Sequence, residues 1–219
     1  MQKKLLKIYE NLYSTFGPQN WWPAEDDFEV IVGAILTQSV SWKNVETAIE
    51  NLKNQNLLNL EGILAVDKTK LGQLIRSTRY YNQKADKLKR FCIYIKQQYH
   101  GDIYALFKKD IYDMRRELLK IKGIGPETAD SIILYAANKP IFVVDAYTQR
   151  IFSRLGLLQK NVKYKGLQDF FMDHLPHDVK LFNEYHALIV NLGKDYCKKT
   201  KPLCEKCPLN SMCNEVFKM

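Results

Sequence analysis

The sequence lacks the segments that direct a chain to a membrane or to export. It contains no run of about 18 apolar residues, which excludes an ordinary membrane-spanning helix. Its first stretch, MQKKLLKIYENLYSTF, is predicted to form an amphipathic helix, and it lacks the cationic region followed by an apolar one that marks a secretory signal. We therefore expect a soluble, cytoplasmic protein with no membrane partner.

The sequence also has little that predicts β-structure, and it has no internal repeat, low-complexity tract or obvious linker. Only PIFVVD, residues 140–145, is predicted to be extended, and it is too short to build a sheet. Elsewhere apolar residues recur at spacings of three and four, as in residues 28–40, 128–139, 146–156 and 181–193. We therefore expect an all-α protein of about ten short helices.

Acidic residues are in the minority. Lys and Arg number 33 against 24 Asp and Glu, which gives a net charge of +9 and a pI near 9.2. This excess favours a polyanionic partner such as nucleic acid, although a mildly basic chain can also have no such partner. Because hydrophobic residues make up 46% of the 219, the chain can bury a sizeable core and is not disordered.

Histidine is scarce, and no two of the four histidines have the spacing of metal ligands. We assign chemistry to none of them: His100, His174, His177 and His186. Of the five cysteines, Cys92 stands alone on the apolar face of a predicted helix. The other four crowd the end of the chain as C-x6-C-x2-C-x5-C, at Cys197, Cys204, Cys207 and Cys213. In a reducing cytosol this cluster indicates a metal site before a set of disulfides.

The stretch KIKGIGPETAD, residues 120–130, predicts a tight turn followed by a helix. Gly123 and Gly125 permit unusual backbone angles and leave the amides bare, and Pro126 suits the first turn of a helix. Bare amides at a helix N-terminus can bind an anion such as phosphate. The alternative is an ordinary tight turn between two packed helices.

Asp145 follows the apolar run of PIFVVD and precedes a predicted helix. This is the position of an N-cap, whose carboxylate accepts hydrogen bonds from backbone N–H groups. Most aspartates in this position only cap a helix. A cap can also be catalytic, because the helix dipole keeps the carboxylate ionised.

The hairpin, the stretch VVDAYTQR and the cysteine loop, in this order, resemble the helix-hairpin-helix DNA glycosylases of the endonuclease III type, from about Phe28 to Cys213. The resemblance implies two α-helical lobes with DNA in the cleft between them. One lobe is a six-helix barrel of residues 28–135, and the other combines residues 1–27 with residues 136–219 around a cluster. We expect a monomer that binds double-stranded DNA containing a damaged base.

The resemblance also implies roles for particular residues. Asp145 matches the catalytic aspartate, and Gln38 matches the residue that fills the space left by a flipped-out nucleotide. The hairpin matches the phosphate-binding turn, and its expected DNA-binding residues are Lys122, Gly123, Ile124 and Gly125. The four terminal cysteines match the ligands of a [4Fe-4S] cluster. Zinc is the alternative, although only Cys204 and Cys207 have the short spacing usual in structural zinc sites.

The sequence departs from part of this family at Glu127. Members that also cleave the DNA strand carry a lysine at this position, and its amine forms a Schiff base with the sugar. A carboxylate cannot form that imine. We therefore expect a monofunctional glycosylase in which Asp145 stabilises the cationic sugar and orients the attacking water. The alternative role of Glu127 is a favourable charge in the first turn of a helix.

The three tryptophans bear on the choice of base. The segment NWWPAEDD and an aromatic residue at position 42 are similar to the 3-methyladenine glycosylases of the endonuclease III superfamily. An indole is a suitable platform for a cationic alkylated purine, and we expect a base pocket of Trp21, Trp22, Trp42 and Glu127. Trp42 follows Gln38 by four residues, so we expect the two on one side of a helix. Two alternatives remain, a glycosylase for mismatched or deaminated pyrimidines such as thymine or uracil, and a non-catalytic DNA-binding module.

Overall fold

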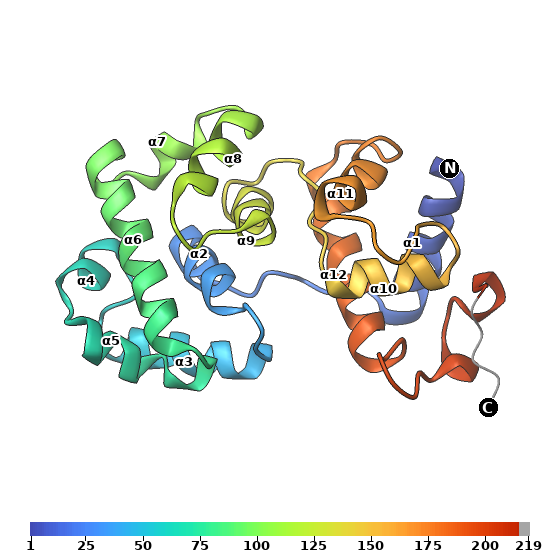
Figure 1. The fold of residues 1–219 in the computed structure, drawn as a ribbon, viewed down its shortest axis with the longest axis horizontal. Coiled ribbons are helices and arrows are strands. Elements are labelled where there is room, and N and C mark those ends of the chain that lie inside the picture. The colour runs from blue at the N-terminus through green and yellow to red at the C-terminus, as the bar shows by residue number, and fades with distance from the viewer. Residues whose placement is uncertain (215–219) are drawn as a thin grey trace. The chain divides into compact units, whose positions relative to one another are not determined.

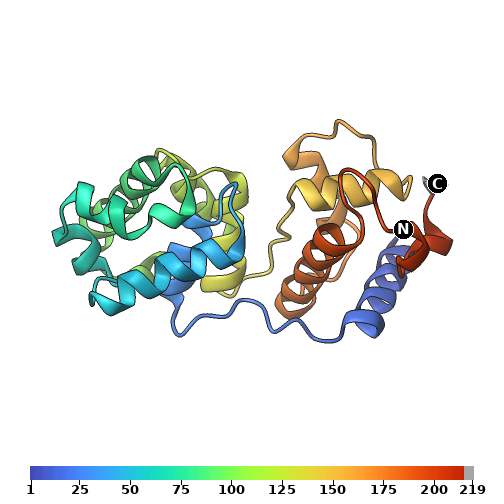
Figure 2. The same ribbon diagram turned by 90° about the horizontal axis from the view of Figure 1, so that it is seen from below.

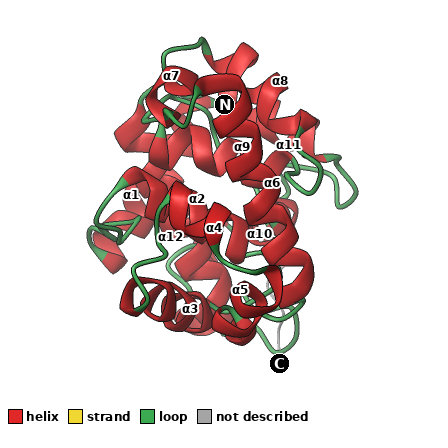
Figure 3. Ribbon diagram, turned by 90° about the vertical axis from the view of Figure 1, so that its left-hand side faces the viewer, coloured by secondary structure: helices red, strands yellow, loops and turns green. Residues whose placement is uncertain are grey.

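The fold is all-α, as the sequence predicts. The computed structural model describes residues 1–214 of the chain. Within these residues every regular element is a helix and no strand is present (Figure 3). None of the helices in this range is long and apolar enough to cross a membrane.

The chain divides into two compact units, which we call the middle unit (Trp22–Lys139) and the terminal unit (Met1–Trp21 with Pro140–Met219). The lobe limits implied by the resemblance, at residues 28 and 135, stay a prediction. The middle unit contains α2 (Asp27–Leu36), α3 (Trp42–Asn54), α4 (Leu60–Ala65), α5 (Lys68–Leu74), α6 (Tyr81–Tyr99), α7 (Ile103–Phe107), α8 (Ile111–Lys120) and α9 (Pro126–Ser131) (Figure 1). A 3₁₀ turn, η1 (Arg76–Thr78), precedes α6, and a π-helical segment, η2 (Ile132–Ala136), continues α9.

Helix α2 is the centre of the middle unit. Its residues from Phe28 to Leu36 are all buried, and all but Glu29 are apolar or glycine, as expected for a helix at the centre of a core. The buried amine of Lys84, on α6, donates a hydrogen bond of 2.8 Å to the Leu36 carbonyl and a second one to the Thr78 carbonyl. Burial lowers the pKa of Lys84 to about 8. The last turn of α2 is therefore closed by a cation, which complements the helix dipole.

The terminal unit contains α1 (Gln2–Phe16), α10 (Ala146–Arg154), α11 (Tyr164–Met172) and α12 (Val179–Asp195), with two 3₁₀ turns, η3 (Cys204–Lys206) and η4 (Asn210–Met212). Helix α1 packs along α12, although the two lie at opposite ends of the chain (Figures 1 and 2). The buried Tyr185 hydroxyl of α12 donates a hydrogen bond of 2.8 Å to the Leu5 carbonyl of α1. The first helix of the chain is thereby fixed to the last long one.

The apolar stretch before Asp145 lies in the core of the terminal unit. Residues 141–144 are buried, and they form neither a helix nor a strand. The ring of Phe142 stacks on that of Phe171 at 4.1 Å between centroids. Gln168 donates a hydrogen bond of 2.8 Å to the buried Phe142 carbonyl, which replaces the ladder bond of a strand. This packing fixes the chain immediately before Asp145.

Candidate functional site

Asp145 is the N-cap of α10, as the sequence predicts. Its Oδ1 atom accepts hydrogen bonds from the Thr148 backbone N–H at 2.7 Å and from the Thr148 hydroxyl at 2.8 Å. In return, the Asp145 N–H donates to the Thr148 hydroxyl oxygen at 3.3 Å, which completes a capping box. The Asp145 side chain is only 13% exposed. The cap therefore holds a carboxylate that is largely removed from water.

The other oxygen of this carboxylate faces a histidine. Asp145 Oδ2 lies 3.8 Å from Nε2 of His186, which is near the outer limit for an ion pair with a protonated imidazole and longer than a direct hydrogen bond. Burial raises the pKa of Asp145, but His186 and the hydrogen bonds from Thr148 together outweigh it, so the pKa lies below its ordinary value. The site thus holds an ionised carboxylate in buried surroundings.

Sequence analysis missed His186, to which it assigned no chemistry. The residue lies on α12, far from Asp145 in the sequence, and no motif links the two. Only the packing of α10 against α12 brings them together. A histidine on the otherwise apolar stretch of a helix was the only available signal, and such a residue is more often a core histidine.

The glycine hairpin lies between α8 and α9, as expected. Gly123 adopts φ +104°, in the region that favours glycine, and the Ile124 N–H closes the turn with a hydrogen bond of 2.9 Å to the Ile121 carbonyl. Arg115 on α8 pairs with both oxygens of the fully buried Asp130 on α9, at 2.6 and 3.2 Å. This bidentate pair ties the two helices together, so the turn between them is held in one shape.

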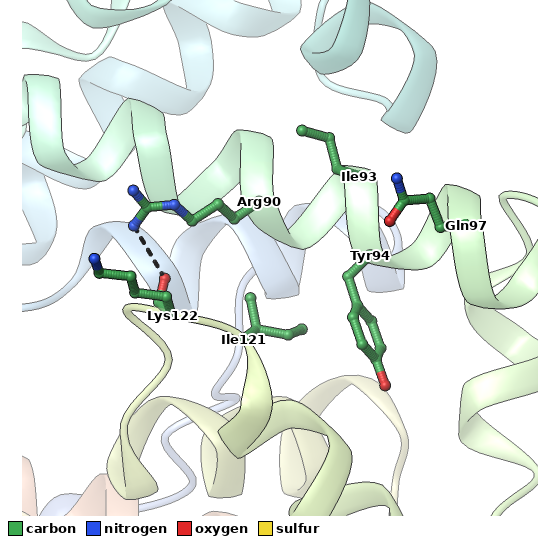
Figure 4. A pocket seen from close by; sticks show the side chains of 6 residues that line it. All are labelled: Arg90, Ile93, Tyr94, Gln97, Ile121 and Lys122. Atoms are coloured by element: carbon green, nitrogen blue, oxygen red, sulfur yellow. Dashed lines mark hydrogen bonds between the residues drawn. The ribbon is translucent and has the colours of Figure 1, made fainter.

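A small pocket lies beside the hairpin, between it and α6 (Figure 4). Its lining residues are Arg90, Ile93, Tyr94, Gln97, Ile121 and Lys122. The Arg90 guanidinium donates to the Lys122 carbonyl at 3.5 Å, and the exposed side chains of both residues lie at the same end of the pocket. That end is cationic, which suits an anion such as a phosphate group.

Gln38 forms hydrogen bonds with side chains of α6 and α9. Its Nε2 donates a hydrogen bond of 2.7 Å to the Thr128 hydroxyl of α9, and its Oε1 accepts one from the Lys87 amine of α6. Burial lowers the pKa of Lys87. The stem of Lys87 lies against the hairpin, because a Cβ added at Gly123 would stand 2.6 Å from Lys87 Cγ. Two residues that sequence analysis did not single out, Lys87 and Thr128, therefore hold Gln38.

The expected helical turn between Gln38 and Trp42 is wrong. Helix α2 ends at Leu36, and α3 begins at Trp42 after an N-cap at Ser41. The Thr37 hydroxyl bonds the Gly33 carbonyl at 2.6 Å, and Ser39 has φ +57°. The backbone therefore leaves the helix before Gln38, and the spacing of four residues no longer places the two side chains on one helix face.

Trp22 and Trp42 meet in an aromatic cluster of the middle unit. Their rings are 5.1 Å apart at 90°, and the ring of Tyr135 is 5.2 Å from that of Trp22. Gly33 lets the Trp22 indole approach α2, since a Cβ there would stand 2.8 Å from the ring. Sequence analysis missed Tyr135.

The two other residues of the expected base pocket, Trp21 and Glu127, belong to the terminal unit and the middle unit, respectively. Trp21 is the last residue of the first segment of the terminal unit, and its side chain is half-buried. Glu127 is exposed in the first turn of α9, next to the buried Thr128. The four residues therefore come from two units of the chain.

The four terminal cysteines lie in one loop that α10 holds in place. The buried Arg154 donates to Cys197 Sγ at 3.3 Å and to the Lys198 carbonyl at 2.8 Å. The Cys213 thiol donates to the Arg154 carbonyl at 3.5 Å. Burial raises the pKa of Cys207, and the charges of Cys197, Cys213 and Cys204 raise it further, so these three cysteines lie within electrostatic reach of Cys207.

The donor set of this loop fits a group bound by thiolates. Three cysteines lie within electrostatic reach of Cys207, and a guanidinium that would stabilise thiolate charge donates to Cys197. Among residues 1–214, no three His, Cys, Asp or Glu side chains are arranged around the position of a single metal ion. The loop therefore offers four cysteine side chains as ligands for such a group.

Comparison with known proteins points to one family. Residues 32–177 match the family described as HhH-GPD superfamily base excision DNA repair protein. A protein of Methanocaldococcus jannaschii named "Putative DNA repair glycosylase" is 50% identical over 210 residues, which cover 95% of each chain. Endonuclease III of Sulfolobus acidocaldarius is 30% identical over 188 residues, covering 85% of this chain and 81% of that one.

Solved structures show the same similarity. The chain resembles 3-methyladenine DNA glycosylase (MagIII) of H. pylori bound to 1,N6-ethenoadenine, with a TM-score of 0.76 and 29% identity over 86% of this chain and 96% of that one. It also resembles a non-covalent endonuclease III–DNA complex, with a TM-score of 0.84 over 98% of this chain and 96% of that one. At 22% identity, the second similarity concerns the fold alone.

The two hairpin glycines should respond differently to alanine. Gly123→Ala should lower the free energy of unfolding by about 1–2 kcal/mol, because φ +104° is unfavourable for alanine and Lys87 would have to move. Gly125→Ala should change it by less than about 0.5 kcal/mol, because φ is −94° and no atom lies within 4 Å of the added Cβ. Urea unfolding of the two variants measures the difference, and equal stabilities would contradict this account of the turn.

Proposed function

The chain belongs to the HhH-GPD superfamily of base excision DNA repair proteins, and we propose that it is a DNA glycosylase that removes alkylated purines such as 3-methyladenine. The observation that carries the proposal is the carboxylate of Asp145, which is only 13% exposed and is held by its capping box. A non-catalytic DNA-binding module would need Asp145 only as a cap, and a cap works equally well exposed to water.

Asp145 acts on the sugar in the proposed reaction. As the bond between base and sugar breaks, positive charge develops on the sugar ring, and a fixed carboxylate stabilises that charge. The lowered pKa keeps Asp145 charged at neutral pH, so no proton has to be removed first. The same carboxylate orients or deprotonates the attacking water. Because the charge exists only in the transition state, the carboxylate speeds the reaction without tightening DNA binding.

The choice of an alkylated purine rests on the aromatic cluster. Trp22 and Trp42 offer indole rings, and an indole attracts a cationic N-methylated purine more strongly than a neutral pyrimidine. Trp21 and Glu127 complete the proposed base pocket. The similarity to a 3-methyladenine glycosylase with a bound adenine derivative supports this choice. The similarity to endonuclease III favours the second candidate, a glycosylase for altered or mismatched pyrimidines.

We propose that the enzyme does not cleave the strand through a Schiff base. Glu127 stands where strand-cleaving members of the family carry lysine, and a carboxylate cannot attack the sugar as an amine does. Glu127 is exposed in the first turn of α9, where its charge favours the helix N-terminus.

DNA is the proposed partner of the hairpin. Lys122 is exposed, and the backbone of Gly123, Ile124 and Gly125 turns with few side-chain atoms to obstruct a phosphate. Gln38 is the proposed wedge. It must exchange its hydrogen bonds to Thr128 and Lys87 for contacts with DNA, so insertion costs the enzyme interactions that it already has.

A [4Fe-4S] cluster is the proposed cofactor, held by Cys197, Cys204, Cys207 and Cys213. Zinc is the alternative. When bound, the cluster would cross-link the loop. The proposed reaction on the sugar uses only amino-acid side chains. Four lysines of the loop, Lys198, Lys199, Lys201 and Lys206, give it a basic character that suits nearby DNA.

A panel of duplexes, each with one defined lesion, tests the substrate. We expect release of 3-methyladenine or 1,N6-ethenoadenine in preference to mismatched thymine or uracil. Strands should break only after alkali, and borohydride should trap no covalent adduct. The control is Asp145→Asn, which should bind the same DNA but lose at least about a hundredfold in rate. Preference for a pyrimidine would overturn the substrate, a trapped adduct would overturn the monofunctional reaction, and an active Asp145→Asn would overturn the catalytic assignment.

Replacing Trp42 tests the stacking platform. Stacking on an aromatic ring is worth about 1–3 kcal/mol, so Trp42→Ala should slow excision of the alkylated purine by about tenfold or more. Trp42→Phe should recover part of the rate. Tyr112→Ala, at a 74% exposed aromatic of the same unit, is the matched control and should excise at the wild-type rate. Unchanged single-turnover excision by Trp42→Ala would remove Trp42 from the pocket.

Metal analysis of protein purified without oxygen tests the cofactor. We expect a brown protein with about four irons per chain. Cys204→Ala should lose the colour and most of the iron. Cys92→Ala, at the buried cysteine of α6, should keep both. A colourless, folded protein with one zinc per chain would replace the cluster by the alternative.

A further inference from the structure

The two carboxylate oxygens of Asp145 face different groups. Oδ1 accepts both hydrogen bonds from Thr148 and is occupied by the cap. Oδ2 takes no part in the cap, and it is the atom that faces His186 at 3.8 Å. The oxygen that is left for chemistry on a sugar or a water is therefore Oδ2. We propose that His186 is a positioning residue that holds Asp145 Oδ2 in its working orientation, an inference that rests on the proposed glycosylase function.

The surroundings of His186 favour a polar role. The His186 side chain is 10% exposed, and it lies on α12 among the buried residues Tyr185, Leu188 and Ile189. A polar ring in such a place destabilises the fold unless it has a polar partner. One polar group that the fold places beside this ring is the Asp145 carboxylate at the start of α10.

The distance between the two side chains is set by a rigid contact further along the same helices. Gly193, about two turns after His186, has no room for a Cβ because the ring of Tyr147 lies against its backbone. Arg150 donates a hydrogen bond of 2.9 Å to the Gly193 carbonyl and lies over the Tyr147 ring at 5.0 Å. Helices α10 and α12 are thus held at one separation, and so are Asp145 and His186.

Orientation matters here because the cap fixes only one oxygen. Thr148 holds Oδ1, and the carboxylate can still turn about that hold. A group facing Oδ2 limits this motion and keeps the second oxygen directed to one place. In active sites a displacement of about 1 Å can reduce the rate by about a hundredfold. Loss of His186 should therefore reduce the rate of the chemical step and leave DNA affinity unchanged.

Single-turnover excision by His186→Ala tests the proposal, with the alkylated purine duplex that the wild type cleaves. We expect a fall of about tenfold to a hundredfold with DNA affinity within about twofold of wild type. His186→Gln should recover part of the rate, and added imidazole should partly rescue His186→Ala. His174→Ala is the matched control, because the His174 ring bonds the Phe170 carbonyl at 2.8 Å on another helix. It should excise at the wild-type rate.

A double-mutant cycle separates positioning from a general loss of stability. If His186 acts through Asp145, then Asp145→Asn with His186→Ala should be no slower than Asp145→Asn alone. Full additivity of the two losses would overturn the proposal, as would wild-type excision by a folded His186→Ala. Should His186→Ala fail to fold, His186→Gln decides by the same cycle. An inactive wild type would overturn the proposed function together with this inference, whereas an active wild type and an active His186→Ala would overturn the inference alone.

Discussion

The hydrogen bonds from Thr148 to Asp145 Oδ1 are the interaction on which the candidate site depends. They begin α10, and they also fix the carboxylate, so folding of the helix and placement of the charge are one event. A cap of this kind contributes about 1 kcal/mol by itself. The buried residues 141–144 and the contact between α10 and α12 add the rest of the constraint. The charge is therefore held by the core of the terminal unit and not by a mobile loop.

Helix α10 connects this carboxylate to the cysteine loop. Its nine residues span about 14 Å, with Asp145 at the start and Arg154 at the end. Arg150 donates to the Cys197 carbonyl at 2.8 Å and Arg154 donates to the Cys197 sulfur. A loop ordered by a bound group would therefore steady the end of α10, and through Gly193 it would steady α12 as well. A group bound in the cysteine loop would in this way influence the position of Asp145 without taking part in the reaction.

Local features of the site were predictable from the sequence, and long-range ones were not. The N-cap at Asp145 and the turn at Gly123 follow from residues within a few positions of each other. The pairing of Asp145 with His186 depends on two helices that no local pattern joins. The same limit explains the error at Gln38, where apolar spacing continued past Leu36 although the helix ends there and Ser39 has a positive φ. The periodicity of apolar residues indicates which side chains are buried, but it does not indicate where a helix ends.

Position 127 carries no lysine, but another amine, that of Lys87, lies near the hairpin. Lys87 lies beside Gly123, and burial lowers its pKa, which increases the fraction of neutral amine. A neutral amine is the form that attacks an aldehyde. Yet this amine donates to Gln38, and Gln38 in turn donates to Thr128. Attack on a sugar would break the first of these bonds and release the residue proposed as the wedge. The arrangement thus commits Lys87 to holding Gln38, which is consistent with the proposed base removal that leaves the strand intact.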